Sequence, residues 1–544
     1  MPQEPSVLKD RWFWLTLIIG GFILSSTLWY GLGMDQAIYA YAAWVWKDYG
    51  LPPYVGEWSG DFPGIFILHR LVIELLGEST LGFRFFDLVV QLNCLAAIFY
   101  LARRLSGTGV SGLLSSIFYA LYYCGLGMLT AERDNYGLWL LLVCAILSLW
   151  LERRVWLRAL LVGLLLSFVF LLKPTLGFSW LFFGVWFLLE GWRRNRKLVW
   201  LELAFFSFCC LSLLGFVVLW YWQIGYLREL YYGPVFYLFK VYLRLSKVTP
   251  LGMLKTCLFL FWTIFQEKPA ALAGAALGIM VPVLNWSETG RRKIFAVLLG
   301  LLAVAAGSFI LQTKNVPYHR APAWGLLMVF SGCGWVWVGN KLKNSAGGWS
   351  GRISAGALYF LLGAIMLSSL DDFCIKFGAR HYGRSFNRAY MDMPDSVGDE
   401  YRAAEFLKPM LKPEDEIVML GDAPLLPYLL KKKLPSKFTI PILLLLHPYG
   451  KDIYPIQKQW MEQYQTEVIS ARPKFFLIYT WVAKNILGMA EPRIKVILAK
   501  EFPRLNQFLH DNYELVTIVD NVEIYVLKSA LPEFPGAKKS SEKP

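Results

Sequence analysis

Three carboxylates stand close to the ends of long apolar stretches. Asp35 follows the run from Trp12 to Tyr30, and Glu132 and Asp134 lie in the short polar segment LTAERDNYG. An ionised group near a lipid bilayer is costly and usually faces a cavity or a charged partner. A carboxylate in that position can also take a proton from a hydroxyl group as a general base. The simpler alternatives are an N-cap for Asp35 and an ordinary polar turn for LTAERDNYG.

Cationic and hydrogen-bonding side chains stand at two further boundaries between apolar and polar sequence. Lys173 ends the apolar part of VFLLKPTLGF, where Pro174 stops the helix. Tyr318, His319 and Arg320 lie in QTKNVPYHRAPAWG, directly before another apolar run. Arginine offers a planar fork to phosphate oxygens, and lysine offers a point charge. A lysine that merely extends to the lipid headgroups is the alternative for Lys173. Carboxylates and cations gathered at one membrane surface would suit chemistry on a lipid-bound phosphate.

These residues belong to a chain that is too apolar for a soluble protein. Of its 544 residues, 56% are hydrophobic and 17% are charged, against roughly 25% charged in soluble domains. Long uncharged stretches recur along the chain, which predicts a polytopic α-helical membrane protein. The net charge of +15 comes from basic residues in short loops between apolar runs. Such loops set membrane orientation, so nucleic-acid binding is not predicted.

The cysteines and histidines do not form a metal-binding pattern. Most of the eight cysteines lie inside apolar runs, as small buried side chains do. The sequence has no CxxC pair, so neither a zinc site nor a disulfide framework is expected. No cofactor is clearly required, although the clustered acids could hold a divalent cation.

Eleven stretches are predicted to cross the membrane, because about 20 apolar residues in a helix span the hydrocarbon core. They are residues 12–30, 80–101, 110–130, 136–151, 157–172, 176–190, 198–222, 269–286, 294–312, 322–340 and 353–370. With the N-terminus in the cytoplasm, the basic loops fall on the cytoplasmic side. This orientation predicts that the 31–79 loop, the 131–135 turn and everything after about Ser369 lie outside the cytoplasm.

The chain is expected to form two domains followed by a tail. Residues 1–370 form the membrane domain, and its first outer loop, 31–79, contains two stretches suited to helices along the membrane interface. Residues 371–533 form an extracytoplasmic α/β domain, and the polar tail 534–544 is expected to be disordered.

The outer domain shows strand and helix patterns. EIVMLGD (416–422) and KFFLIYT (474–480) are predicted strands, and ELVTIVDNVEIYVLK (514–528) is a predicted hairpin that turns at Asp520-Asn521. Residues 401–411 and 504–513 have helical patterns.

Residues 33–89 resemble the first outer loop of GT-C fold glycosyltransferases. The resemblance rests on an acid just after the first span, a later Pro-Gly pair and an arginine at the next span, here Asp35, Pro63-Gly64 and Arg84. The similar branch contains the bacterial aminoarabinose transferase of lipid A and the protein O-mannosyltransferases. AERDNYG resembles the second acidic position of that family, without deciding between Glu132 and Asp134. LLKPTLG and YHRAPAWG resemble segments that hold the lipid phosphate.

The chain departs from the family pattern at two places in this loop. Gln36 stands where many relatives have a second acid, and Asp61-Phe62 stands where many have a lysine before the Pro-Gly pair. These departures leave the type of donor and any role of a metal open.

The resemblance implies an inverting glycosyltransferase in the bacterial inner membrane. Its donor would be a polyprenyl-phosphate-linked sugar and its acceptor a hydroxyl group of a glycolipid, glycan or protein at the outer face. The implied site residues are the catalytic acids Asp35 and Glu132 or Asp134, the phosphate-binding Lys173, Tyr318, His319 and Arg320, and Asp61 and Arg84 near the substrate loop.

Two other classes of protein compete with the enzyme. A lipid or oligosaccharide transporter, or flippase, would show charged residues near mid-membrane and internal repeats, whereas the predicted spans are nearly free of charge at their centres and no repeat is evident. A membrane scaffold with an outer binding domain would leave the three charged clusters without a role.

Overall fold

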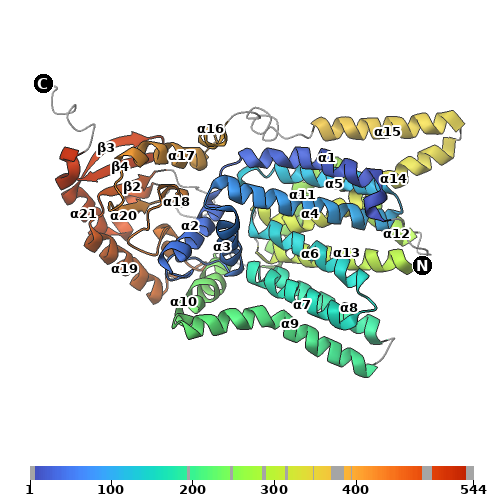
Figure 1. Ribbon diagram of the computed structural model, residues 1–544, viewed down its shortest axis with the longest axis horizontal. Helices are drawn as coiled ribbons and strands as arrows, with labels where there is room; N and C mark the ends of the chain where they lie inside the picture. The colour runs from blue at the N-terminus through green and yellow to red at the C-terminus, as the bar shows by residue number, and fades with distance from the viewer. Residues whose placement is uncertain are drawn as a thin grey trace. The chain divides into compact units, whose positions relative to one another are not determined.

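The computed structural model describes residues 6–192, 196–245, 249–284, 289–312, 316–346, 348–368, 385–393, 395–480 and 493–533. The chain divides into two compact units. Unit 1 comprises residues 1–30, 83–223 and 248–383, and unit 2 comprises residues 31–82, 224–247 and 384–544. Figure 1 shows long helices in unit 1 and a small sheet with its helices in unit 2. The 31–79 loop, which the sequence-based division assigned to the membrane domain, therefore packs together with the C-terminal segment. The predicted disordered tail, 534–544, lies outside the described residues.

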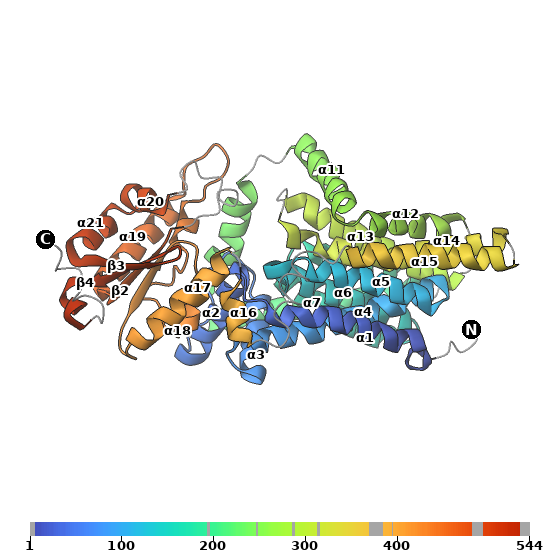
Figure 2. The same cartoon turned by 90° about the horizontal axis from the view of Figure 1, so that it is seen from above.

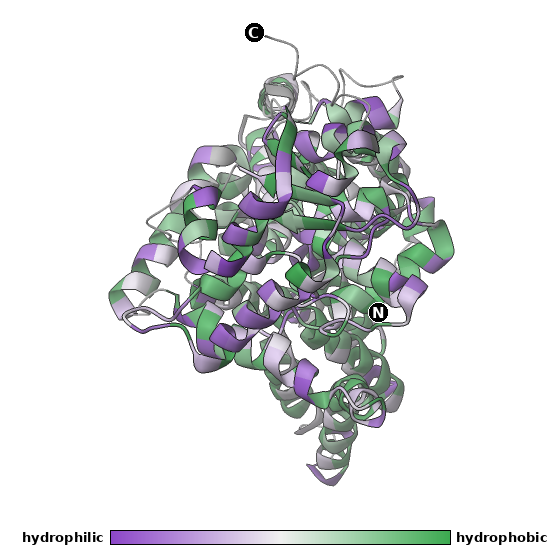
Figure 3. Ribbon diagram, turned by 90° about the vertical axis from the view of Figure 1, so that its left-hand side faces the viewer, coloured by the Kyte–Doolittle hydropathy of each residue, from purple (hydrophilic) through white to green (hydrophobic). Residues whose placement is uncertain are grey.

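Unit 1 is a bundle of long apolar helices. They are α1 (Arg11–Ser25), α4 (Thr80–Ser106), α5 (Gly109–Cys124), α6 (Arg133–Trp150), α7 (Val155–Leu172), α8 (Ser179–Trp192), α9 (Arg196–Gln223), α11 (Pro250–Glu267), α12 (Pro269–Leu284), α13 (Thr289–Gln312), α14 (Ala321–Ala346) and α15 (Gly348–Ser368). In Figure 3, hydrophobic residues cover most turns of the helices at the bottom of the view.

The helices confirm a polytopic α-helical membrane protein. Each of the eleven predicted spans overlaps one of them. Within the described residues, six helical segments are long and apolar enough to cross a membrane, and four shorter apolar helices accompany them. The number of crossings, eleven, stays a prediction.

Helix α11 is an element that the sequence analysis missed. Residues 223–252, between the predicted spans 198–222 and 269–286, contain α10 (Leu227–Leu230), the π-helix η5 (Tyr231–Val241) and the beginning of α11. Figure 2 shows α11 tilted relative to α12. Its apolar side chains include Leu258 and Trp262, which are 60% and 55% exposed. An exposed apolar face of this kind is suited to contact with lipid.

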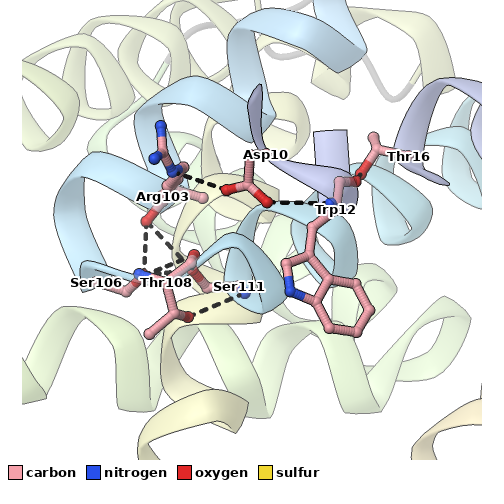
Figure 4. Close-up of polar contacts among 8 residues, drawn as sticks. Asp10, Trp12, Thr16, Arg103, Ser106, Thr108 and Ser111 are labelled. Carbon is pink, nitrogen blue, oxygen red and sulfur yellow. Dashed lines mark hydrogen bonds and ion pairs between the residues drawn. The ribbon is translucent and has the colours of Figure 1, made fainter. Parts of the chain in front are cut away.

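The beginning of α1 is tied to the end of α4 through Asp10 (Figure 4). One carboxylate oxygen of Asp10 accepts a hydrogen bond from the backbone N–H of Trp12 at 3.0 Å. The other lies 2.9 Å from Nε of Arg103 in the last turn of α4. Thr108 caps α5 by accepting a hydrogen bond from the N–H of Ser111. Each such cap stabilises its helix by about 1 kcal/mol, so this corner fixes three helix ends together.

Arg158 of α7 is a fully buried cation that joins three helices. Its Nη1 and Nη2 atoms lie 2.6 Å from carboxylate oxygens of Glu190 on α8 and Glu202 on α9, respectively. Its guanidinium carbon also lies 4.1 Å from the centroid of the Phe187 ring. The two carboxylates and the aromatic face together compensate for the cost of burying the guanidinium.

Changing Arg158 to Leu is expected to lower the stability of unit 1, because the change removes the cation that pairs with the buried carboxylate of Glu202 and one of the two cations beside the partly exposed Glu190. Removing one partner of a buried ion pair costs about 3–5 kcal/mol. Thermal unfolding of the full-length protein in detergent measures the loss. The triple variant Arg158→Leu, Glu190→Gln, Glu202→Gln removes the charges as well and should recover most of the stability. A triple variant as unstable as the single one would contradict this explanation.

Unit 2 contains a mixed four-stranded sheet in the order β1-β2-β4-β3. Strand β1 (Ile417–Leu420) pairs in parallel with β2 (Phe475–Tyr479), and β4 (Val522–Leu527) pairs antiparallel with both β2 and β3 (Tyr513–Val519). All residues of β1 and β2 are buried. The predicted strands and hairpin are confirmed. Asp520 has a φ of 50° in the hairpin turn, a conformation that Asp tolerates better than most residues.

Besides α10, the described part of unit 2 contains eight α-helices, which include both helices predicted in the 31–79 loop. They are α2 (Met34–Tyr49), α3 (Gly64–Leu76), α16 (Phe386–Met391), α17 (Asp395–Leu407), α18 (Leu425–Leu430), α19 (Pro455–Ala471), α20 (Ile494–Glu501) and α21 (Pro503–Asn512). Helix α2 is buried from Gln36 to Val45 and packs against α3 and α18. Helix α3 leaves Leu71, Leu75 and Leu76 exposed, which suits a position at the membrane interface.

Candidate active site

A buried cluster of three side chains lies in unit 1 where three elements meet. Asp134 is in the first turn of α6, Lys173 directly follows α7, and His319 lies in the 3₁₀ helix η7 (Pro317–Arg320). Nζ of Lys173 lies 2.8 Å from Oδ2 of Asp134 and 2.9 Å from Nδ1 of His319. Nδ1 of His319 lies 3.3 Å from the same oxygen of Asp134. All three side chains are buried, so the lysine does not extend to the headgroups and that alternative is wrong.

Local sequence explains why these side chains stand at helix ends. Pro174 cannot continue α7, because it has no N–H to donate and its ring clashes with the preceding turn. Lys173 is therefore left at the C-cap with extended backbone. Pro317 at the start of η7 has a φ suited to a helical turn, and this places His319 one residue before the last residue of η7.

The geometry of the cluster fixes the protonation of the imidazole. An ammonium group can only donate hydrogen bonds, so Nδ1 of His319 accepts one from Lys173 and its Nε2 carries the ring proton. Among the described residues, that Nε2–H, Oδ1 of Asp134 and the amide of Asn135 are buried without a hydrogen-bond partner. Unsatisfied buried polar atoms are rare in proteins and call for an explanation such as a missing ligand. The cluster thus combines a buried cation with open hydrogen-bonding groups.

Asn135 is a candidate that the sequence analysis missed. It stands next to Asp134 in AERDNYG, and an amide can both donate to and accept from a ligand. The sequence feature that could have identified Asn135 is its position in AERDNYG, the segment singled out for its acids Glu132 and Asp134.

The polar turn before α6 is held by buried hydrogen bonds and is not an ordinary exposed turn. The N–H of Ala131, whose φ is 62°, donates to the hydroxyl of Tyr123 at 2.7 Å. That hydroxyl donates in turn to Asp87 on α4 at 2.7 Å. Arg84, also on α4, donates to Oγ1 of Thr130 at 2.8 Å and to the carbonyl of Tyr30 at 3.0 Å. Arg84 is therefore a buried residue that positions this turn.

The other predicted residues of unit 1 lie on the same elements as the cluster. Glu132 is the N-cap residue of α6 and is buried. Tyr318 and Arg320 are buried in η7, and the Tyr318 ring packs edge-on against the His319 ring with 4.4 Å between centroids. Unit 1 thus brings Asp134, Lys173 and His319 into direct contact and places Glu132, Tyr318 and Arg320 beside them in sequence.

Asp35 belongs to unit 2, where it lies in the first turn of α2 and is partly exposed. The N-cap of this helix is Gly33, so the N-cap alternative for Asp35 is wrong. A carboxylate in the first turn of a helix is favoured by the positive end of the helix dipole. That Asp35 shares one reaction centre with the unit 1 cluster stays a prediction.

Asp61 has a local role in a turn of unit 2. Its backbone carbonyl accepts a hydrogen bond from the hydroxyl of Tyr54 at 2.7 Å. Its backbone N–H donates to Oγ of Ser59 at 3.1 Å, and that hydroxyl donates to the Asp61 carboxylate at 3.3 Å. A contact of Asp61 with substrate stays a prediction.

Within the described part of the chain, no group of three or more His, Cys, Asp or Glu side chains is arranged to hold a metal ion. Asp134, one of the clustered acids considered for a divalent cation, instead contacts Lys173 and His319.

The fold is the GT-C fold of membrane glycosyltransferases. Two crystal structures of ArnT from Cupriavidus metallidurans, one in the apo state and one bound to undecaprenyl phosphate, each match this chain with a TM-score of 0.53. They are 13% and 11% identical to it, respectively, and each match covers 94% of this chain and 97% of ArnT. The Archaeoglobus fulgidus oligosaccharyltransferase, tethered to an acceptor peptide, matches with a TM-score of 0.51, 12% identity, and coverage of 94% of this chain and 73% of that protein. No family model matches the sequence, and no curated protein matches it.

Proposed function

We propose that this protein is an inverting membrane glycosyltransferase that moves a sugar from a polyprenyl-phosphate donor to a hydroxyl acceptor. The observation that carries the proposal is the buried contact of Asp134, Lys173 and His319 inside a GT-C fold. A cation next to an open imidazole N–H suits a phosphate group, and the ArnT structure of the same fold holds undecaprenyl phosphate. The reaction takes place at the outer face of the bacterial inner membrane, on a glycolipid, glycan or protein.

The chemistry requires one base and no acid. In the transfer step the acceptor oxygen bonds to C1 of the sugar from the side opposite the leaving group, and the bond from C1 to the phosphate oxygen breaks. The leaving group is a phosphate monoester whose second pKa is about 6, so it departs as a dianion without taking a proton. Glycoside hydrolysis differs, because its leaving group needs an acid.

The side chains divide this work between them. Asp35 takes the proton from the acceptor hydroxyl, a contribution of roughly 10²–10⁴-fold in rate. Lys173, the Nε2–H of His319, and Arg320 stabilise the charge that grows on the phosphate. Preplaced charges of this kind usually accelerate a reaction more than any other single effect, by about 3–4 kcal/mol per donor. Asp134 holds the ammonium of Lys173 in place, Tyr318 donates a further hydrogen bond to the phosphate, and Glu132 orients the sugar or the acceptor.

A direct assay tests the proposal. Purified full-length protein is mixed with a labelled polyprenyl-phosphate sugar and an envelope extract from cells that lack the gene, since these cells accumulate the unmodified acceptor. Release of free polyprenyl phosphate that depends on the extract, with label appearing in the extract, supports the transferase. Movement of intact donor between the leaflets of a vesicle without cleavage would instead identify a transporter.

A further inference from the structure

A second acidic side chain of unit 2 lies at the carboxyl end of the parallel strands. Asp422 follows β1, after Gly421, whose φ is 117°. A Cβ atom at Gly421 would lie 2.6 Å from the carbonyl oxygen of Tyr479 at the end of β2, so only glycine fits this turn. In open α/β sheets, ligands bind beyond the carboxyl ends of parallel strands. The turn therefore presents Asp422 at the usual ligand-binding edge.

Asp422 is close enough to Asp35 for their charges to interact. Helix α18 begins just after Asp422 and packs against α2, which carries Asp35 in its first turn. The Asp422 side chain is only 8% exposed, and its Oδ1 atom has no hydrogen-bond partner among the described residues. Burial, and next the negative charge of Asp35, raise the pKa of Asp422 to about 7. A buried carboxylate oxygen that accepts no hydrogen bond is energetically costly, and a ligand that donates a hydrogen bond to it removes that cost.

The other acids at this edge already have partners. Glu400 on α17 accepts a hydrogen bond from the N–H of Leu426 at 2.9 Å. Burial raises the pKa of Glu400 well above its ordinary value, and the charge of Asp422 adds to this shift. Asp399 is bound by Arg402 at 2.8 Å, by Asn521 at 2.7 Å and by the hydroxyl of Tyr479 at 3.3 Å. Of these three acids, Asp422 is therefore the one with a buried carboxylate oxygen that accepts no hydrogen bond from the described residues.

We infer that Asp422 binds the acceptor beside Asp35, and that the acceptor is a carbohydrate with neighbouring hydroxyl groups. Asp35 takes the proton of the attacking hydroxyl, and Asp422 accepts a hydrogen bond from the hydroxyl next to it. Two carboxylates whose charges interact match two neighbouring hydroxyl donors, whereas a serine or threonine side chain presents one hydroxyl. This inference rests on the proposed function and adds its substrate class.

The inference predicts a pH dependence that involves acceptor binding. Asp422 is ionised above a pH of about 7, and an ionised carboxylate accepts the stronger, charge-assisted hydrogen bond. The groups facing it are Asp35 on α2, Glu400 on α17 and Tyr479 on β2. The KM for the acceptor should therefore fall as the pH rises through about 7.

The experiment uses the transfer assay of the full-length protein with the envelope extract, and it has a chemical and a mutational arm. In the chemical arm, the extract is treated with periodate, which cleaves vicinal diols, and is quenched before the donor is added. Treatment is expected to abolish acceptor activity. Equal transfer to treated and untreated extract overturns the carbohydrate assignment. Absence of transfer to untreated extract contradicts the proposed function itself, so the two failures are distinguishable.

In the mutational arm, Asp422→Asn is expected to raise the KM for the acceptor by about 10-fold or more, to leave the KM for the donor unchanged and to remove the pH dependence near 7. Asp422→Glu should restore part of the affinity. Glu400→Gln is the matched control, because the amide keeps the acceptor for Leu426 and changes an acid of the same edge whose carboxylate already has a partner. An unchanged acceptor KM in Asp422→Asn overturns the inference. So does a wild-type protein that a metal chelator inactivates while Asp422→Asn leaves the acceptor KM unchanged.

Discussion

Changing Asp35 to Asn is expected to reduce sugar transfer by at least about 100-fold while the protein stays folded in the membrane. The amide keeps the size of the side chain and its place in the first turn of α2 but cannot take the proton of the acceptor, and a general base is worth roughly 10²–10⁴-fold. The rate of polyprenyl phosphate release measures the loss, and the melting temperature in detergent measures folding.

The matched control for this change is Asp48→Asn on the same helix. Asp48 lies near the other end of α2 and forms a partly exposed pair with Lys47 at 3.4 Å, so its replacement should leave transfer nearly unchanged. Normal turnover in Asp35→Asn would exclude Asp35 as the base. Equal losses in both variants would point to a general effect on α2.

Changing Lys173 to Met is expected to abolish transfer and also to destabilise unit 1. Methionine has a similar length but no charge, so Asp134 is left as a buried carboxylate without its cation. Loss of one partner of a buried pair costs about 3–5 kcal/mol, and loss of a charge that stabilises the leaving phosphate costs about 3–4 kcal/mol in the transition state. The two effects have to be measured separately.

The double variant Lys173→Met, Asp134→Asn separates them. With both charges removed, the melting temperature should recover most of its loss, because no unpaired ion remains in the interior. Transfer should remain absent, since the cation for the phosphate is still missing. Recovery of transfer together with stability would show that the pair is structural and would remove it from the proposed site.

The elements that form within short stretches of sequence were predictable. The Asp520-Asn521 turn lies between two runs of alternating apolar residues, and both residue types accept turn conformations. The hairpin therefore follows from residues within one segment, and the structure has it between β3 and β4. Lys173 at the end of α7 is predictable in the same way, because Pro174 stops a helix whatever surrounds it.

Helix α11 shows where local patterns fail. Its apolar stretch is shorter than a full crossing and contains Lys255, Thr256 and Gln266. It therefore does not meet the criterion of about 20 apolar residues for a membrane span. The burial of α2 was equally hidden, because the aromatic residues that suit a membrane interface also suit packing against α3 and α18.

The sequence by itself determined most of the apolar helices, the strands of the C-terminal segment and the kinds of side chain available for chemistry, because each of these depends on neighbours within about one element. Only the tertiary structure decided which side chains meet. Asp134 and Lys173 are 39 residues apart and Lys173 and His319 are 146 residues apart, and the packing of α18 on α2 brings Asp422 close enough to Asp35 for their charges to interact. Contacts across such separations depend on how whole helices pack, and no local periodicity encodes that packing.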